Sequence, residues 1–347
     1  MSDSHLDYLR ERYTGAAETA VHDEHFSAVA NRVIDPSGKR VAPFVGIPTL
    51  LDAPVREIDW TAPDFSDLDV ALLGMPMDLA ISNRNGCRFG PRALRAIERI
   101  GPYNHVLKVA PTFDLKVADI GDVNFRSRYS LEGCHADIEK AIAAIIAAGV
   151  TPLSAGGDHS ITLPILRAIG KKHGPVALIH VDAHCDTGGP FEECRFHHGG
   201  PFRHAVLEGV LDPRHTIQIG IRGSSEMLWE FSYDSGMTVV HAEEFAEMGV
   251  EAVIEKARAV VGDKPVYISF DVDSLDPAFA PGTGTPEIGG LSTREAQALL
   301  RGLAGLPVVG GDVVEVAPQY DTTTNTAHAG AQMLFEILSL MAIERLV

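Results

Sequence analysis

Three short motifs carry aspartate and histidine residues at spacings that suit metal binding. They are GGDHS at residues 156–160, DAHCD at residues 182–186 and DVD at residues 271–273, and each follows an apolar run. In an extended chain, side chains two residues apart point to the same side. Each motif can therefore aim its carboxylates and imidazoles at one point. The potential ligands are His159, Asp182, His184, Asp186, Asp271 and Asp273.

Four aspartates and two histidines at one sheet edge would bring about four negative charges into a partly desolvated cleft. Such repulsion needs cations, and two divalent ions would neutralise it. Carboxylate and imidazole ligands without thiolate suit Mn2+, with Ni2+, Co2+ and Zn2+ as chemical alternatives. Two metal ions ~3.5–4 Å apart can bridge a water molecule and lower its pKa until hydroxide forms near neutral pH. The constellation thus predicts a hydrolase.

The elements that must position these motifs alternate along the chain from residue 70 onward. Short apolar runs predict strands, and amphipathic segments between them predict helices. This alternation implies right-handed crossovers and a three-layer α/β/α fold with a mostly parallel sheet, in which ligands bind beyond the carboxyl ends of the strands. The predicted strands are 70–74, 151–154, 176–180, 216–221, 238–241, 266–270 and 308–316, and the predicted helices are 92–100, 137–148, 163–172, 243–261, 293–303 and 325–345.

Residues 1–65 are polar and interrupted by Pro36, Pro43, Pro48, Pro54 and Pro63, without sustained periodicity. They predict an N-terminal arm with one short helix, followed by a single catalytic domain over residues 66–347. The N-terminus lacks the pattern of a secretory signal, and the four cysteines contain no C-x-x-C pair. We therefore expect a cytoplasmic protein.

The chain is acidic, with 29 Lys and Arg against 47 Asp and Glu and a net charge of −18. Nucleic acid and anionic membranes are therefore poor partners, because phosphate groups are bound by clustered basic residues. The most apolar stretch, residues 331–343, is interrupted by Glu336 and is shorter than the ~20 residues of a membrane span. We expect no membrane partner.

The motifs GGDHS, DAHCD and SFDVDSLDPAFAPGTGTPEIGG resemble the three signatures of the ureohydrolases, the arginase and agmatinase family. The resemblance covers about residues 65–347 and implies an arginase-like α/β/α fold with a binuclear manganese centre. It also implies hydrolysis of a guanidino group to urea and an amine, with a metal-bridging hydroxide as nucleophile. All six metal ligands are present, and Asp182 and Asp271 match the positions that bridge both ions.

Two further positions match the family. His198, in the sequence HHGG at residues 197–200, resembles the histidine that relays a proton to the leaving amine. Glu315 resembles the acid that binds the guanidinium nitrogens, a role that suits a carboxylate because the guanidinium is a planar donor. Asp182, Asp271, His198 and Glu315 are thus the predicted catalytic residues. Gly200 departs from the family, in which threonine usually follows His-Gly.

The predicted substrate is a small cationic guanidino compound other than arginine. Arginases carry an Asn- and Ser-rich loop after DAHxD, whereas this chain has TGGPFEECRF at residues 187–196. That loop, GIPT at residues 46–49 and NRNGCRFGP at residues 83–91 resemble the agmatinase and guanidino-acid hydrolase branch. Agmatine, guanidinobutyrate, guanidinopropionate, guanidine and a biguanide remain open. The resemblance also implies a homo-oligomer, a hexamer or trimer, and assembly with a paralogue is an alternative.

Two other functions remain as alternatives. A zinc-dependent deacetylase shares the sheet architecture and an Asp-x-His element, but its one-metal site would not need His159, Asp186 and Asp273. A non-catalytic partner subunit would keep the fold for assembly, but such a subunit should have lost ligands, and this chain has lost none.

Overall fold

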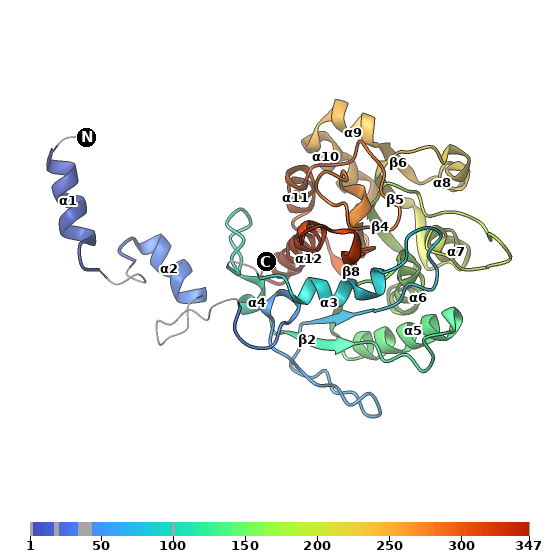
Figure 1. Cartoon of the computed structure of the whole chain (residues 1–347), viewed down its shortest axis with the longest axis horizontal. Coiled ribbons are helices and arrows are strands. Elements are labelled where there is room, and N and C mark those ends of the chain that lie inside the picture. The colour runs from blue at the N-terminus through green and yellow to red at the C-terminus, as the bar shows by residue number, and fades with distance from the viewer. Residues whose placement is uncertain (1–2, 17–20, 34–43, 99–100, 347) are drawn as a thin grey trace. The chain divides into compact units, whose positions relative to one another are not determined.

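The computed structural model describes residues 3–16, 21–33, 44–98 and 101–346, and the chain divides into two units, residues 1–45 and 46–347. The first unit contains helices α1 (Asp3–Tyr13) and α2 (Glu24–Val33) (Figure 1). The arm therefore has two helices where the sequence predicts one. Pro36 and Pro43 lie outside the described residues. The domain boundary at residue 65 stays a prediction.

The second unit is built on one eight-stranded sheet in which every strand pair is parallel. The strand order is β2-β1-β3-β8-β7-β4-β5-β6. This arrangement confirms the predicted α/β class. The strands are β1 (Val70–Gly74), β2 (Val117–Asp122), β3 (Thr151–Ala155), β4 (Val176–Val181), β5 (Leu211–Ile221), β6 (Thr238–His241), β7 (Val266–Asp271) and β8 (Val308–Val314).

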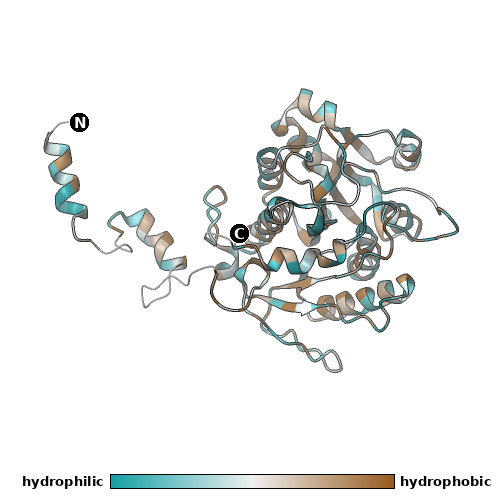
Figure 2. Cartoon of the chain, in the orientation of Figure 1, coloured by the Kyte–Doolittle hydropathy of each residue, from teal (hydrophilic) through white to brown (hydrophobic). Residues whose placement is uncertain are grey.

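Helices cover both faces of the sheet and enclose two hydrophobic cores. Leu178 and Tyr267 face the core formed with α5, α6 and α7, whereas Ile179 and Ile268 face the core formed with α10, α11 and α12. In Figure 2, α5 carries both hydrophobic and hydrophilic residues, as expected for a helix with one buried face. The helices of this unit are α3 (Gly90–Arg95), α4 (Pro111–Asp114), α5 (Leu131–Ala147), α6 (Thr162–His173), α7 (Pro201–Leu207), α8 (Glu230–Ser235), α9 (Ala242–Met248), α10 (Val250–Val261), α11 (Thr293–Gly302) and α12 (Asn325–Leu346).

Several elements differ from the sequence-based prediction, among them α4, α7 and α8, which were not predicted. Strand β2 was not predicted, because its short apolar run is interrupted by Asp119 and Gly121. The single helix predicted over 243–261 is two helices, α9 and α10, because Gly249 between them has a φ of +77°. The helix predicted over 92–100 ends at Arg95, and residues 99–100 lie outside the described part.

Helix α12 is long and apolar enough, by length and composition, to cross a membrane. However, 83% of the apolar stretch within Asn325–Arg345 is buried inside the protein. The helix contacts β8, α3 and α11, and its buried residues belong to the larger hydrophobic core. The burial therefore identifies α12 as a core helix.

The four central strands β3, β8, β7 and β4 are neighbours in the sheet. Each of them is followed by residues that the sequence predicts to be functional. Because all four strands run in the same direction, their carboxyl ends lie at one edge. The topology thus brings the three motifs and Glu315 together although they are far apart in sequence.

Candidate metal centre

The GGDHS motif leaves β3 in a turn that only glycine can form. A Cβ atom on Gly157 would lie 1.9 Å from the backbone oxygen of Met77. Asp158 then caps the short helix His159–Ile161, accepting the backbone N–H of Ser160 at 3.0 Å. The close packing and the cap together fix the fully buried His159 at the end of the strand.

Three carboxylates surround Nδ1 of His159. This atom lies 2.9 Å from Oδ2 of Asp186, 3.1 Å from Oδ2 of Asp182 and 3.3 Å from Oδ2 of Asp271. Burial lowers the pKa of His159, but the three aspartates beside Nδ1 outweigh burial and raise the pKa well above its ordinary value. The environment of Nδ1 therefore attracts positive charge.

The other ring nitrogen shows which tautomer of His159 suits a metal ion. Nε2 lies 2.8 Å from Oγ of Ser269, and Oγ donates its hydrogen to Oδ1 of Asp312 at 2.7 Å. Ser269 must therefore accept the Nε2–H of His159, and in the neutral imidazole this leaves an unprotonated Nδ1 facing the carboxylates. Nδ1 is buried and has no hydrogen-bond partner among the described residues. A nitrogen lone pair beside three carboxylates fits a divalent cation.

A second group of potential ligands shares Asp182 with the first. Nδ1 of His184 lies 3.1 Å from Oδ2 of Asp273 and 3.5 Å from Oδ1 of Asp182. Within each group the candidate ligand atoms lie within 4.8 Å of one another. The first group is His159, His180, Asp182 and Asp186, and the second is Asp182, His184 and Asp273. Two groups joined by a shared carboxylate have the form of a binuclear site.

Asp271 belongs to neither group, although its Oδ2 faces His159. Its other oxygen accepts the backbone N–H of Asp273 at 2.8 Å. Burial, followed by the charges of Asp273 and Asp182, raises the pKa of Asp271 well above its ordinary value. The crowding of carboxylates that the sequence predicts is thus present, and it favours bound cations.

His198 and Glu315 lie together beside these ligand groups. Nδ1 of His198 is 3.1 Å from Oε1 of Glu315, and the same oxygen accepts the backbone N–H of His159 at 2.9 Å. Oε2 of Glu315 is buried and has no nitrogen or oxygen partner among the described residues, while the thiol of Cys87, a weak donor, lies beside this carboxylate. One carboxylate oxygen is thereby left available for a ligand.

Sequence reasoning missed two residues that contact the predicted ligands and a third that contacts one of these two. His180 contacts Asp182, Ser269 contacts His159, and Asp312 contacts Ser269. All three are fully buried within strands that were predicted. The sequence signal that could have identified them is a polar residue inside an apolar run. Such a residue requires a partner when buried, which places it next to other polar groups.

Gly200, the departure from the family pattern, lies in a crowded loop. A Cβ atom there would lie 3.0 Å from the backbone oxygen of Gly188 and 3.3 Å from Nε2 of His197. That Nε2 donates to the backbone oxygen of Gly189 at 2.7 Å. The imidazole of His197 thus fills the space beside Gly200 and connects two parts of the loop between β4 and α7, which carries both Asp186 and His198.

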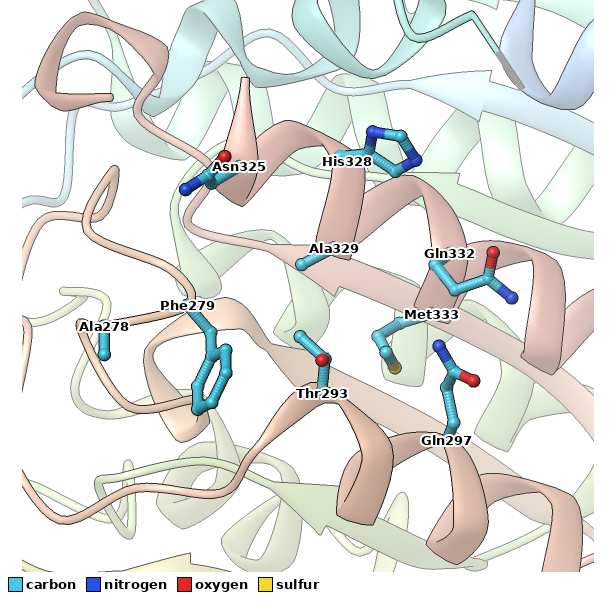
Figure 3. Close-up of a pocket in the computed structure, with 9 residues that line it drawn as sticks. All are labelled: Ala278, Phe279, Thr293, Gln297, Asn325, His328, Ala329, Gln332 and Met333. Atoms are coloured by element: carbon cyan, nitrogen blue, oxygen red, sulfur yellow. The ribbon is translucent and has the colours of Figure 1, made fainter. Parts of the chain in front are cut away.

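A pocket of about 340 Å³ lies away from these groups, between α11, α12 and the loop that carries Ala278 and Phe279 (Figure 3). Amide side chains and an exposed histidine line it together with apolar residues. None of its lining residues is a predicted metal ligand. They are Ala278, Phe279, Thr293, Gln297, Asn325, His328, Ala329, Gln332 and Met333.

Relatives with named activities match nearly the whole chain. It is 46% identical over 311 residues to a mitochondrial agmatinase of Gallus gallus, and the match covers 89% of each chain. It is 48% identical over 303 residues to a guanidinopropionase of Pseudomonas aeruginosa, covering 86% of this chain and 93% of the relative.

Solved structures with the same fold share less sequence. Proclavaminate amidino hydrolase from Streptomyces clavuligerus has a TM-score of 0.81 at 37% identity, covering 88% of this chain and 100% of that one. Formiminoglutamase of Trypanosoma cruzi, described with Mn2+, has a TM-score of 0.74 at 28% identity, covering 86% and 99%.

The family comparison agrees with the three motifs and with the arrangement of the ligand groups. The sequence model of the arginase family matches residues 68–339 of this chain. This range contains all six predicted ligands, His198 and Glu315. The chain therefore belongs to the arginase family and is related to its agmatinase and guanidino acid hydrolase members.

Proposed function

We propose that this enzyme hydrolyses the guanidino group of a small guanidino compound other than arginine, releasing urea and an amine. The observation that carries the proposal is the buried Glu315, whose Oε2 has no nitrogen or oxygen partner in the described part of the chain, beside two groups of potential metal ligands. A guanidinium cation supplies the N–H donors that this oxygen lacks. The names of the relatives, agmatinase, guanidinopropionase and guanidinobutyrase, support this substrate class.

The residues divide the work of the reaction. His159, Asp186, His184 and Asp273 would each hold one of two divalent ions, and Asp182 and Asp271 would bridge them. When bound, such ions balance the carboxylate charge and lower the pKa of water towards neutrality. Glu315 orients the guanidinium carbon towards the ligand groups through its free oxygen. His198 donates a proton to the departing nitrogen, because its ring lies against Glu315 at the same site.

We propose Mn2+ as the ion, with Ni2+ as the main alternative. Carboxylate and imidazole ligands suit both, and no cysteine thiolate is among the predicted ligands. The formiminoglutamase with the same fold is described with Mn2+, which supports the first choice. Reconstituting the metal-free enzyme with Mn2+ or Ni2+ in parallel and comparing turnover distinguishes them.

Two groups that share Asp182 favour this proposal over a zinc-dependent deacetylase with a one-metal site. A panel of guanidino compounds tests it against acetylated amines in the same buffer. The proposed function predicts urea from at least one guanidino compound and no acetate. Acetate without urea would overturn it, and urea release by this chain alone excludes a non-catalytic subunit.

We further propose a cytoplasmic homo-oligomer, a hexamer or trimer, with assembly with a paralogous subunit as the alternative. The arm before residue 65 supports assembly, because its exposed Phe26 and Phe44 offer apolar surface to a neighbouring copy. Light scattering of the full chain and of a version without the arm tests this. A full-length monomer at micromolar concentration would contradict it, and subcellular fractionation tests the location.

A further inference from the structure

His180 lies within β4, two residues before Asp182, and its side chain is fully buried. Its Nε2 is 2.7 Å from Oδ2 of Asp182, the oxygen that also faces His159. His180 belongs to the first group of potential ligands by distance. The imidazole could therefore bind a metal ion through Nε2, or it could donate Nε2–H to Asp182. These two roles require different tautomers.

Gln218 on the neighbouring strand β5 decides between the two tautomers. It pairs in register with His180, and its Nε2 lies 2.5 Å from the backbone oxygen of Cys185. A backbone carbonyl only accepts hydrogen bonds, so the amide nitrogen of Gln218, and not its oxygen, must face Cys185. The same Nε2 lies 3.1 Å from Nδ1 of His180.

The proton on His180 follows from this orientation. Nε2 of Gln218 donates one hydrogen to Cys185 and the other to Nδ1 of His180, so Nδ1 accepts and carries no proton. A neutral imidazole with an unprotonated Nδ1 carries its proton on Nε2. Nε2–H then donates to Oδ2 of Asp182. This nitrogen has no lone pair to offer a metal ion.

We propose that His180 is a positioning residue that fixes the shared ligand Asp182, and that Gln218 sets its tautomer. The inference rests on the proposed metal-dependent function. Oδ1 of Asp182 accepts the backbone N–H of His184 at 2.7 Å, and Oδ2 accepts from His180. With both oxygens held, the carboxylate that joins the two ligand groups cannot rotate away from either.

Packing keeps the imidazole of His180 in this orientation. Its ring centroid lies 4.3 Å from that of Phe202 and 5.3 Å from that of His159. A ring between two aromatic neighbours in a buried strand has little room to turn. Without the hydrogen bond from Nε2–H, the carboxylate of Asp182 would lose freedom of rotation only when the metal ion binds. This entropic cost would lower the affinity for the metal ion. Partners behind metal ligands typically contribute about 10–100-fold in affinity.

The test is calorimetric titration of the full-length, metal-free enzyme with Mn2+, with no substrate present. His180→Phe keeps a ring but removes the donor, and His180→Gln keeps an N–H at the corresponding atom. Gln218→Met removes the amide that sets the tautomer. His173→Phe is the matched control, because His173 is an exposed residue at the end of α6.

We expect His180→Phe to bind as many ions as the native enzyme, with an affinity at the shared site about 10–100-fold lower. His180→Gln should recover most of this loss, Gln218→Met should shift affinity in the same direction as His180→Phe, and His173→Phe should not differ from native. If His180→Phe does not fold, the Mn2+ affinity of Gln218→Met alone tests the proposal.

Two results would overturn the proposal. The loss of one ion from the stoichiometry of His180→Phe would make His180 a ligand, and unchanged affinity in both His180→Phe and Gln218→Met would remove its role. These readings are separate from the proposed function, which fails if the native, metal-loaded enzyme releases no urea.

Discussion

Nδ1 of His198 lies 3.1 Å from Oε1 of Glu315, and Nε2 of the same ring lies 2.7 Å from Oγ of Ser82. Burial lowers the pKa of His198, but the hydrogen bond to Glu315 and its charge outweigh burial and raise the pKa to about 9. His198 is therefore protonated at neutral pH. An imidazolium in this position can give a proton to a leaving amine.

The roles of His198 and Asp273 separate when each is replaced by alanine. Asp273→Ala removes a charged oxygen beside His184, so metal content and turnover should fall together. His198→Ala should keep its metal and lose turnover by about 10²–10⁴-fold, the usual contribution of general acid–base catalysis. Metal analysis and turnover on the same preparation check this. If His198→Ala loses metal as Asp273→Ala does, His198 is a ligand.

Replacing Glu315 by glutamine should weaken substrate binding and change the pH profile. Loss of a charge-assisted hydrogen bond lowers kcat/KM for guanidino compounds by at least about tenfold. His198 also loses the carboxylate that raises its pKa to about 9, so the alkaline limb of the activity profile should move to lower pH. Initial rates over a pH series measure both effects. An unmoved alkaline limb would contradict the role of this contact.

Arg222 fixes the loop that carries Asp273 and Thr285. Its guanidinium is almost fully buried and donates only to backbone oxygens, including those of Asp273 at 2.7 Å and Glu287 at 2.7 Å. Lysine cannot replace this fork of donors, so Arg222→Lys leaves buried carbonyl groups unpaired. We expect a loss of at least about 2 kcal/mol in the free energy of unfolding.

Thermal unfolding measures the effect at Arg222, and the exposed Arg294→Lys serves as the control. A change at Arg294 should stay within about 0.5 kcal/mol. Equal melting temperatures for Arg222→Lys and the native enzyme would show that the carbonyl groups find other partners.

His135 should make the stability of the enzyme sensitive to mild acid. Burial, and then the charges of Arg167 and His204, lower its pKa to about 4, and its Nδ1 has no hydrogen-bond partner among the described residues. In the unfolded state His135 binds a proton near pH 6.5, whereas in the folded state it does not until about pH 4. The contribution of the neutral His135 to the free energy of unfolding is therefore fully present above pH 6.5. It is lost as the pH falls towards 4, by about 3 kcal/mol in total.

His135→Phe removes this proton uptake and keeps an aromatic ring beside Phe196. The native melting temperature should therefore fall more steeply than that of His135→Phe between pH 6.5 and 4. Metal loss at low pH affects both proteins alike. Parallel curves for the two proteins would contradict the prediction.

Much of the fold could be predicted because buried parallel strands leave a strong sequence signal. The ranges predicted for β1 and β6 coincide with those observed, since turn residues bound their apolar runs. Strand β2 could not be predicted, because Asp119 interrupts it. That residue pairs with Arg95 at 2.7 Å and accepts the backbone N–H of Leu50 at 2.9 Å, and both partners are distant in sequence.

The sequence motifs allow the candidate site residues to be predicted. They do not allow the contacts between residues of different motifs and strands to be predicted. His180 and Gln218 meet because β4 and β5 are paired in a particular register. Glu315 was predicted inside a strand ending at residue 316, but β8 ends at Val314 and Glu315 adopts a φ of +64°. Its backbone N–H donates to Gly157, so this turn depends on the neighbouring strand β3.

The two groups of ligands that share Asp182 make this chain a metal-dependent ureohydrolase. The most direct test measures urea released by the metal-free enzyme as Mn2+ is returned in steps, with metal content determined at each step. Agmatine, guanidinobutyrate, guanidinopropionate and guanidine serve as substrates. We expect no urea without metal, and a rate that rises until about two ions are bound per chain. Urea release that is independent of metal, or no urea from any guanidino compound at full loading, would contradict it.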